Sequence, residues 1–115
     1  MSKVVEALLD NAYQDSVLLQ GNDEKGDVFS IPRDVDFLFY ALDKEKGELV
    51  ASFINDNRYG DASYYQSEEN HCIKVIINMP TEQHIINSIS GLMVCIAEIY
   101  GLEYDGWGCA LQTNT

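Results

Sequence analysis

The spacing of apolar residues divides the chain into helical and extended segments. Repeats of three and four residues, typical of amphipathic helices, occur over residues 3–14, 44–58 and 81–100. Strand patterns, with the clearest alternation in the first and third, occur over residues 34–40, 62–66 and 72–79. A last strand is expected over residues 103–112, where glycines soften its entry. Residues 20–27 are polar, include two glycines and are expected to form a loop.

The order of these segments predicts the fold. After the first helix it is strand, helix, strand, strand, helix, strand, which is the split βαβ or ferredoxin-like arrangement. We therefore expect an α+β sandwich in which two long helices cover one face of the sheet, with an extra N-terminal helix. No linker, repeat or low-complexity tract interrupts the pattern. Residues 1–115 are therefore expected to form a single domain, with the N-terminal helix over 3–14 and the core over 28–112.

The first strand and the ends of two helices carry more detailed signals. Alternation places Val35, Phe37 and Phe39 on the buried face of the first strand. Asp43 is expected to cap the helix that follows it. Gly60 is expected to provide a left-handed stop after that helix, and Gly101 is expected to end the last one.

The charge balance excludes some partners and favours others. The chain has 7 Lys and Arg against 19 Asp and Glu, a formal net charge of −12, and this charge is divided evenly between residues 1–50 and 51–115. Nucleic acids and anionic membranes require cations, so direct binding to either is not expected. The acidity favours a basic protein partner, although solubility alone would also explain it.

Cysteine usage and the N-terminal pattern point to the cytoplasm. Cys72, Cys95 and Cys109 are odd in number and lack a CxxC spacing, so we expect reduced residues rather than disulfides. Acids interrupt the apolar residues near the N-terminus, unlike those of a signal peptide. The longest apolar stretch, residues 91–97, is too short to span a membrane.

A search for catalytic or metal-binding patterns finds none that is specific. The glycines lack the spacing of a phosphate loop, and His71 and Cys72 point to opposite faces of a strand. His84 has no second nitrogen ligand nearby. Asp34 and Asp36 share a strand face and would suit a divalent cation, but solvation explains them more simply. We therefore predict a protein without catalytic residues, cofactor or metal.

Carboxylates and tyrosines near the sheet are the candidates for partner binding, because aromatic residues within an acidic surface suit a protein interface. The candidate set is Asp34, Asp36, Tyr40, Asp61, Tyr64, Tyr65, Glu68, Glu69 and Glu103. Of the consecutive Tyr64 and Tyr65, one is expected to pack inward and the other to be displayed. Ordinary sheet packing is the alternative role for these tyrosines.

Two segments resemble a known family. Residues 31–40 read Ile-Pro-Arg-Asp-Val-Asp-Phe-Leu-Phe-Tyr and resemble the opening strand of the RraB family, bacterial regulators of ribonuclease E activity. The stretch Tyr104-Asp105-Gly106-Trp107 resembles that family's closing strand. The resemblance covers about residues 28–112. It implies a ferredoxin-like sandwich that binds a ribonuclease and lowers its activity, without catalysis of its own. In that family the Tyr-Asp-Gly-Trp stretch is expected to serve the fold: Gly106 permits the bend and Trp107 packs under the helices.

Two other functions stay open at this stage. The chain ends without the acidic extension expected of the family, so an immunity protein that neutralises a toxic nuclease is an alternative. The second is a small-molecule sensor or a structural dimer that pairs through Leu38, Tyr40 and Ile76. Both nuclease-binding functions require a basic partner, whereas the dimer does not.

Overall fold

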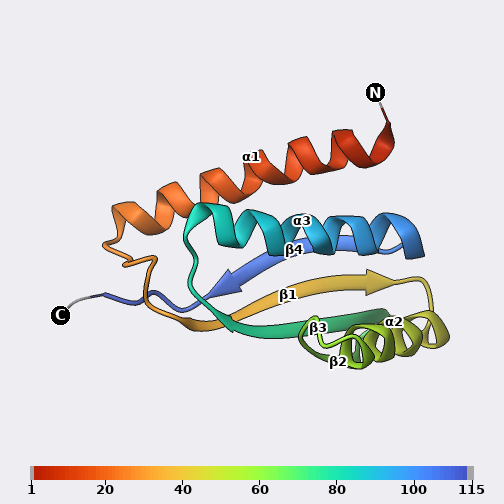
Figure 1. Cartoon of the computed structure of the whole chain (residues 1–115). Coiled ribbons are helices and arrows are strands. Elements are labelled where there is room, and N and C mark those ends of the chain that lie inside the picture. Colours follow the sequence, from red (N-terminus) through yellow and green to blue (C-terminus); the bar gives the residue numbers. More distant parts are fainter. Residues whose placement is uncertain (1, 114–115) are drawn as a thin grey trace.

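The computed structural model describes residues 2–113, and two central strands, β1 (Arg33–Ala41) and β3 (Asn70–Met79), form the middle of its four-stranded sheet. The elements in chain order are α1 (Lys3–Glu24), β1 (Arg33–Ala41), α2 (Lys44–Asp56), β2 (Asp61–Ser67), β3 (Asn70–Met79), α3 (Gln83–Tyr100) and β4 (Glu103–Cys109). The strands lie in the order β2-β3-β1-β4, and each neighbouring pair is antiparallel. This confirms the predicted α+β, ferredoxin-like fold with an additional N-terminal helix (Figure 1).

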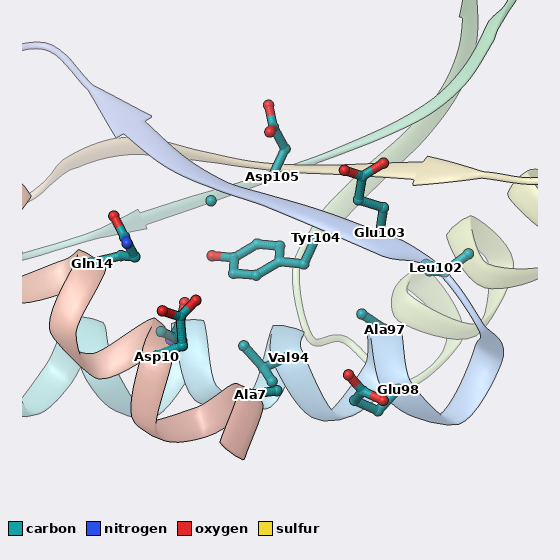
Figure 2. A pocket seen from close by; sticks show the side chains of 12 residues that line it. Ala7, Asp10, Gln14, Val94, Ala97, Glu98, Leu102, Glu103, Tyr104 and Asp105 are labelled. Atoms are coloured by element: carbon teal, nitrogen blue, oxygen red, sulfur yellow. The ribbon is translucent and has the colours of Figure 1, made fainter. Parts of the chain in front are cut away.

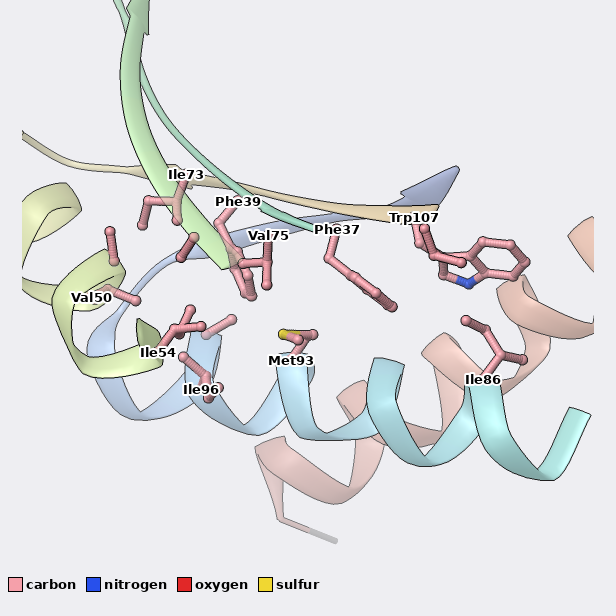
Figure 3. Packing of buried hydrophobic residues seen from close by; sticks show 14 of the residues in the cluster. Phe37, Phe39, Val50, Ile54, Ile73, Val75, Ile86, Met93, Ile96 and Trp107 are labelled. Atoms are coloured by element: carbon pink, nitrogen blue, oxygen red, sulfur yellow. The ribbon is translucent and has the colours of Figure 1, made fainter. Parts of the chain in front are cut away.

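The hydrophobic core lies between one face of the sheet and the helices α2 and α3. Phe37 and Phe39 of β1 are fully buried, as the alternation predicts, and they pair in register with Val75 and Ile73 of β3. The helices contribute further buried side chains, which Figure 3 shows facing the sheet: Val50, Ile54, Ile86, Met93 and Ile96. The opposite face of the sheet carries none of these helices and is left open.

The first helix is longer than its pattern predicts. It continues to Glu24, ten residues beyond the predicted end at residue 14, and it takes up most of the expected loop at 20–27. The reason is tertiary: Asp15 and Leu19 are buried, so the second half of α1 has a packing surface that outweighs the helix-weakening effect of Gly21. The apolar residues that suggested the helix are largely exposed, among them Val5 and Leu9.

The ends of α2 and α3 test the predicted caps. Asp43 Oδ1 accepts a hydrogen bond from the Lys46 amide at 2.8 Å, and Gly101 ends α3 with φ 72°, as expected. The prediction for Gly60 is wrong, because α2 ends at Asp56 and Arg58 takes the left-handed conformation, with φ 58°. Gly60 instead lies so close to β3 that a Cβ atom there would be 2.5 Å from Val75.

A buried ion pair holds together the segment before β1 and the segment after β4. The Arg33 guanidinium contacts Asp27 at 2.6 Å and donates to the carbonyl oxygen of Val28 at 2.7 Å. Asp27 also accepts from the Gln112 amide at 2.9 Å. Arg33 therefore serves the fold and is not a surface charge. Within residues 2–113, no helix is long and apolar enough to cross a membrane.

Candidate functional site

The face of the sheet that carries no helix, here called the open sheet face, gathers most of the residues predicted to bind a partner. Residues that are paired across neighbouring strands form rows of side chains on this face. One row contains Tyr65, Cys72, Tyr40 and Glu103, and a parallel row contains Asp61, Ile76, Asp36 and Gly108. Residues far apart in the sequence are therefore neighbours on one surface.

The open sheet face has a strongly uneven charge. Its five exposed carboxylates are those of Asp34, Asp36, Asp61, Glu103 and Asp105. In the four strands, all of them within the described residues, only two bases occur: Arg33 is buried in its ion pair, which leaves Lys74 on this face. The surface is therefore electronegative and suits a cationic partner.

The tyrosine hydroxyls on this face respond to the acidic surroundings. The negative charge of Asp105 raises the pKa of Tyr40, and Glu103 adds to this effect. Burial is the main cause of the raised pKa of Tyr65, and Asp36 contributes. The Lys74 ammonium lies 5.9 Å from the centre of the Tyr65 ring. Both tyrosines therefore stay protonated near neutral pH and can donate hydrogen bonds.

A shallow hollow of about 260 Å³ lies on the open sheet face. Its lining includes Leu38 and Tyr65, with Asp36, Lys74 and Asp105 as charged groups. A lining that combines apolar side chains with two carboxylates suits the aliphatic stem and charged head of a lysine or arginine.

Three of the predicted residues lie elsewhere. Tyr64 is the inward member of the tyrosine pair: its ring lies against Gly47 of α2 and its hydroxyl hydrogen-bonds His71 Nδ1 at 2.7 Å. Tyr65 is the displayed one. Glu68 and Glu69 form the turn between β2 and β3, at the end of the sheet. They are exposed but are not part of the open sheet face.

Asp105 joins this face although it was not predicted to bind a partner. A register shift between Phe37 and Phe39 accommodates the extra residue of β4, and Gly106 has φ 91°, which favours glycine. Tyr104 and Asp105 are consecutive strand residues and point in opposite directions, with Tyr104 toward the helices and Asp105 away from them (Figure 2). The extra residue lets Trp107, three positions after Tyr104, point inward as well. The glycine-rich sequence around Gly106 was the only signal for this irregularity.

On the helix side of β4, Tyr104 and Trp107 belong to a buried polar network that connects this strand with α1 and α3. Trp107 Nε1 donates to Asp15 Oδ1 at 2.8 Å, and Asn11 donates to Asp15 Oδ2 at 3.4 Å. Ser90 Oγ lies 2.9 Å from the Tyr104 hydroxyl and 3.3 Å from Asp15 Oδ1. Burial raises the pKa of Asp15, an effect that the hydrogen bonds from Trp107 and Ser90 oppose.

A groove of about 480 Å³ lies on the helix side of β4, between α1 and the second half of α3 (Figure 2). Asp10 and Glu98 line it from the helices, and Glu103 and Asp105 line it along β4. Asp105 and Gly106 line both this groove and the hollow on the open sheet face. The two acidic surfaces therefore meet along β4.

The described His, Cys, Asp and Glu side chains bear on the metal and thiol chemistry considered for the sequence. Among residues 2–113, no group of three or more His, Cys, Asp or Glu side chains is arranged to hold a metal ion. Asp34, which with Asp36 would suit a divalent cation, accepts a hydrogen bond from the Asn78 side chain at 3.0 Å. Cys72, Cys95 and Cys109 are all free thiols.

Comparison with known proteins agrees with the fold and with the sequence resemblance. The family RraB, Regulator of ribonuclease activity B, matches residues 12–109. A search of curated proteins finds no match. The matched region includes the second half of α1, the whole sheet and the Tyr104–Trp107 stretch. Since this match spans most of the chain, the protein belongs to the RraB family of regulators of ribonuclease activity.

Proposed function

We propose that this protein binds a ribonuclease through its open sheet face and lowers the activity of that enzyme, without catalysing a reaction itself. The observation that carries the proposal is that five exposed carboxylates share the open sheet face with Tyr40 and Tyr65, with Lys74 as the accompanying base. Membership of a family of ribonuclease regulators supports the choice of partner.

The proposed mechanism is electrostatic docking followed by local packing. A ribonuclease must hold phosphates and therefore presents a basic surface. An electronegative face attracts such a surface over a long range and accelerates association. Tyr40 and Tyr65 then provide aromatic contacts, while the hollow beside Lys74 receives a lysine or arginine side chain. The free state of all three thiols supports a cytoplasmic encounter.

A pair of triple variants with equal charge changes tests the location. Asp34→Asn, Asp36→Asn and Asp61→Asn remove three charges from the open sheet face, whereas Glu45→Gln, Glu48→Gln and Asp56→Asn remove three exposed charges from α2. We expect the first triple to lower the association rate with ribonuclease E about tenfold and to restore RNA cleavage. The α2 triple should inhibit nearly as well as the unaltered protein. Equal losses from both triples would show that bulk charge, and not the open sheet face, controls binding.

Salt and the identity of the partner complete the test. Because salt screens exposed charges, the association rate is expected to fall as ionic strength rises. A rate that does not respond to salt would contradict electrostatic docking. Capture of partners from the native cell, scored for ribonucleases, then identifies the enzyme. Recovery of a nuclease toxin encoded beside this protein would indicate immunity instead, and recovery of no nuclease would refute both functions.

A further inference from the structure

The outer surface of α1 carries a continuous apolar row that no other element covers. Val5, Leu9, Tyr13 and Val17 are 42%, 58%, 65% and 49% exposed and follow one another at intervals of four residues. We call these four residues the α1 ridge. Single exposed apolar residues are common, but four large ones in a contiguous row are typical of an interaction surface.

The position of α1 keeps this ridge free. The helix packs on α3 through the side that carries Asp15 and Leu19, and its other side faces outward (Figure 1). A row at intervals of four residues is also the ridge that packs into the groove of a neighbouring helix. The row from Val5 to Val17 extends about 18 Å, which matches a partner helix of three to four turns.

The charges beside the ridge identify the chemistry of the partner. Glu6 and Asp10 each follow a ridge residue directly and so form the adjacent row, and Asp10 also lines the acidic groove between α1, α3 and β4. Within α1 five acids stand against one base, Lys3 in the first turn, whose Nζ lies 3.9 Å from Glu98 Oε2. A second copy of the chain, with a net charge of −12, would bring like charges together at this surface.

We propose that the α1 ridge binds an amphipathic helix of another protein, whose apolar row is flanked by lysine or arginine on the side facing the acidic groove. The apolar row covers Leu9 and Tyr13, and the basic flank faces the exposed carboxylates of Glu6 and Asp10. This surface is separate from the open sheet face, and the proposal does not depend on which enzyme that face binds.

The test uses the full chain and a designed 18-residue peptide helix with leucines in one row and lysines along one flank. Titration calorimetry measures its affinity, and amide chemical shifts locate the site. We expect Leu9→Ser with Tyr13→Ser to weaken binding about tenfold or more, because the apolar contact is lost. Leu49→Ser with Ile99→Ser, which alters exposed apolar residues on α2 and α3, should leave the affinity within about twofold.

The charge component has its own matched pair. Glu6→Gln with Asp10→Asn should weaken binding about threefold, whereas Glu45→Gln with Glu48→Gln on α2 should have little effect. A peptide with glutamates in place of the lysines should fail to bind. Circular dichroism of each variant confirms that the fold is retained.

Three outcomes would overturn the proposal. Equal losses in the ridge variants and their controls would show non-specific attraction. Shifts confined to the open sheet face would place the peptide on the other acidic surface. Light scattering that finds a dimer which Leu9→Ser dissociates would make a second copy the occupant. The ridge variants are expected to bind the ribonuclease as the unaltered protein does, because the ridge and the open sheet face are separate surfaces. The peptide measurements alone decide whether the ridge binds a helix.

Discussion

The helices of this protein are attached in two different ways. α2 and α3 lie on the sheet through fully buried apolar side chains such as Val50, Ile54 and Met93. The 22 residues of α1 include only two buried side chains, Leu19 and the carboxylate of Asp15. Apolar burial is non-directional, so the first attachment tolerates small shifts. The hydrogen bond from Trp107 to Asp15 is directional, so it sets the position of α1.

This difference has consequences for stability and for function. Losing a core residue affects the whole domain, whereas losing the polar network releases mainly α1. The ridge and the wall of the acidic groove are both on α1, so their alignment with β4 depends on Asp15. The following variants test whether the two attachments are energetically distinct.

The largest effect is expected in the sheet core. Phe37→Ala should lower the free energy of unfolding by about 3–5 kcal/mol, because it leaves a cavity in the core between the sheet and the helices. Denaturant titration followed by circular dichroism measures this loss. Leu49→Ala, at an exposed position of α2, should change it by about 0.5 kcal/mol or less. Similar losses for the two variants would contradict the assignment of the core.

Removing the buried carboxylate should have the next largest effect. Asp15→Ala leaves Trp107 Nε1 without an acceptor and is expected to cost about 2–3 kcal/mol. Hydrogen exchange should become faster in α1 before it does in β1. Asp23→Ala is the exposed control on the same helix. Uniform acceleration across the sheet would mean that α1 and the core form one cooperative unit.

Removing only the donor sharpens the comparison further. Trp107→Phe keeps an aromatic ring against the core but leaves Asp15 without its shortest hydrogen bond, so a loss of about 1–2 kcal/mol is expected. Circular dichroism must follow unfolding, because Trp107 is the single tryptophan. The double variant Asp15→Ala with Trp107→Phe should lose clearly less free energy of unfolding than the sum of the two single losses. Additive losses would show that the two residues do not act together.

The smallest effect is expected from pH. Burial raises the pKa of Asp15 above its ordinary value of 3.8, so the folded protein holds the proton more tightly than the unfolded chain. Stability relative to Asp15→Asn should therefore fall as pH rises from about 3.8 through the folded pKa. Unfolding free energies of both proteins over this range measure the difference. A difference that grows in the opposite direction would show that the pKa of Asp15 is lowered.

The fold and much of the open sheet face were predictable from local pattern. Alternation identified the buried residues of β1, and the same alternation placed Asp34 and Asp36 on the opposite side. The length of α1 was not predictable, because its second half depends on contacts with α3 rather than on its own composition. Which of Tyr64 and Tyr65 faces outward depended on the register of β2 against β3.

By itself the sequence determined the order of elements, the apolar face of the sheet and the excess of negative charge, because these depend on periodicity and composition. Only the tertiary structure decided where that charge gathers. Strand pairing brings Glu103 and Asp105 of β4 beside the acids of β1, while the bulge at Gly106 turns Trp107 inward, where it reaches Asp15 of α1. Such arrangements join residues distant in the chain through directional bonds, which no local pattern encodes.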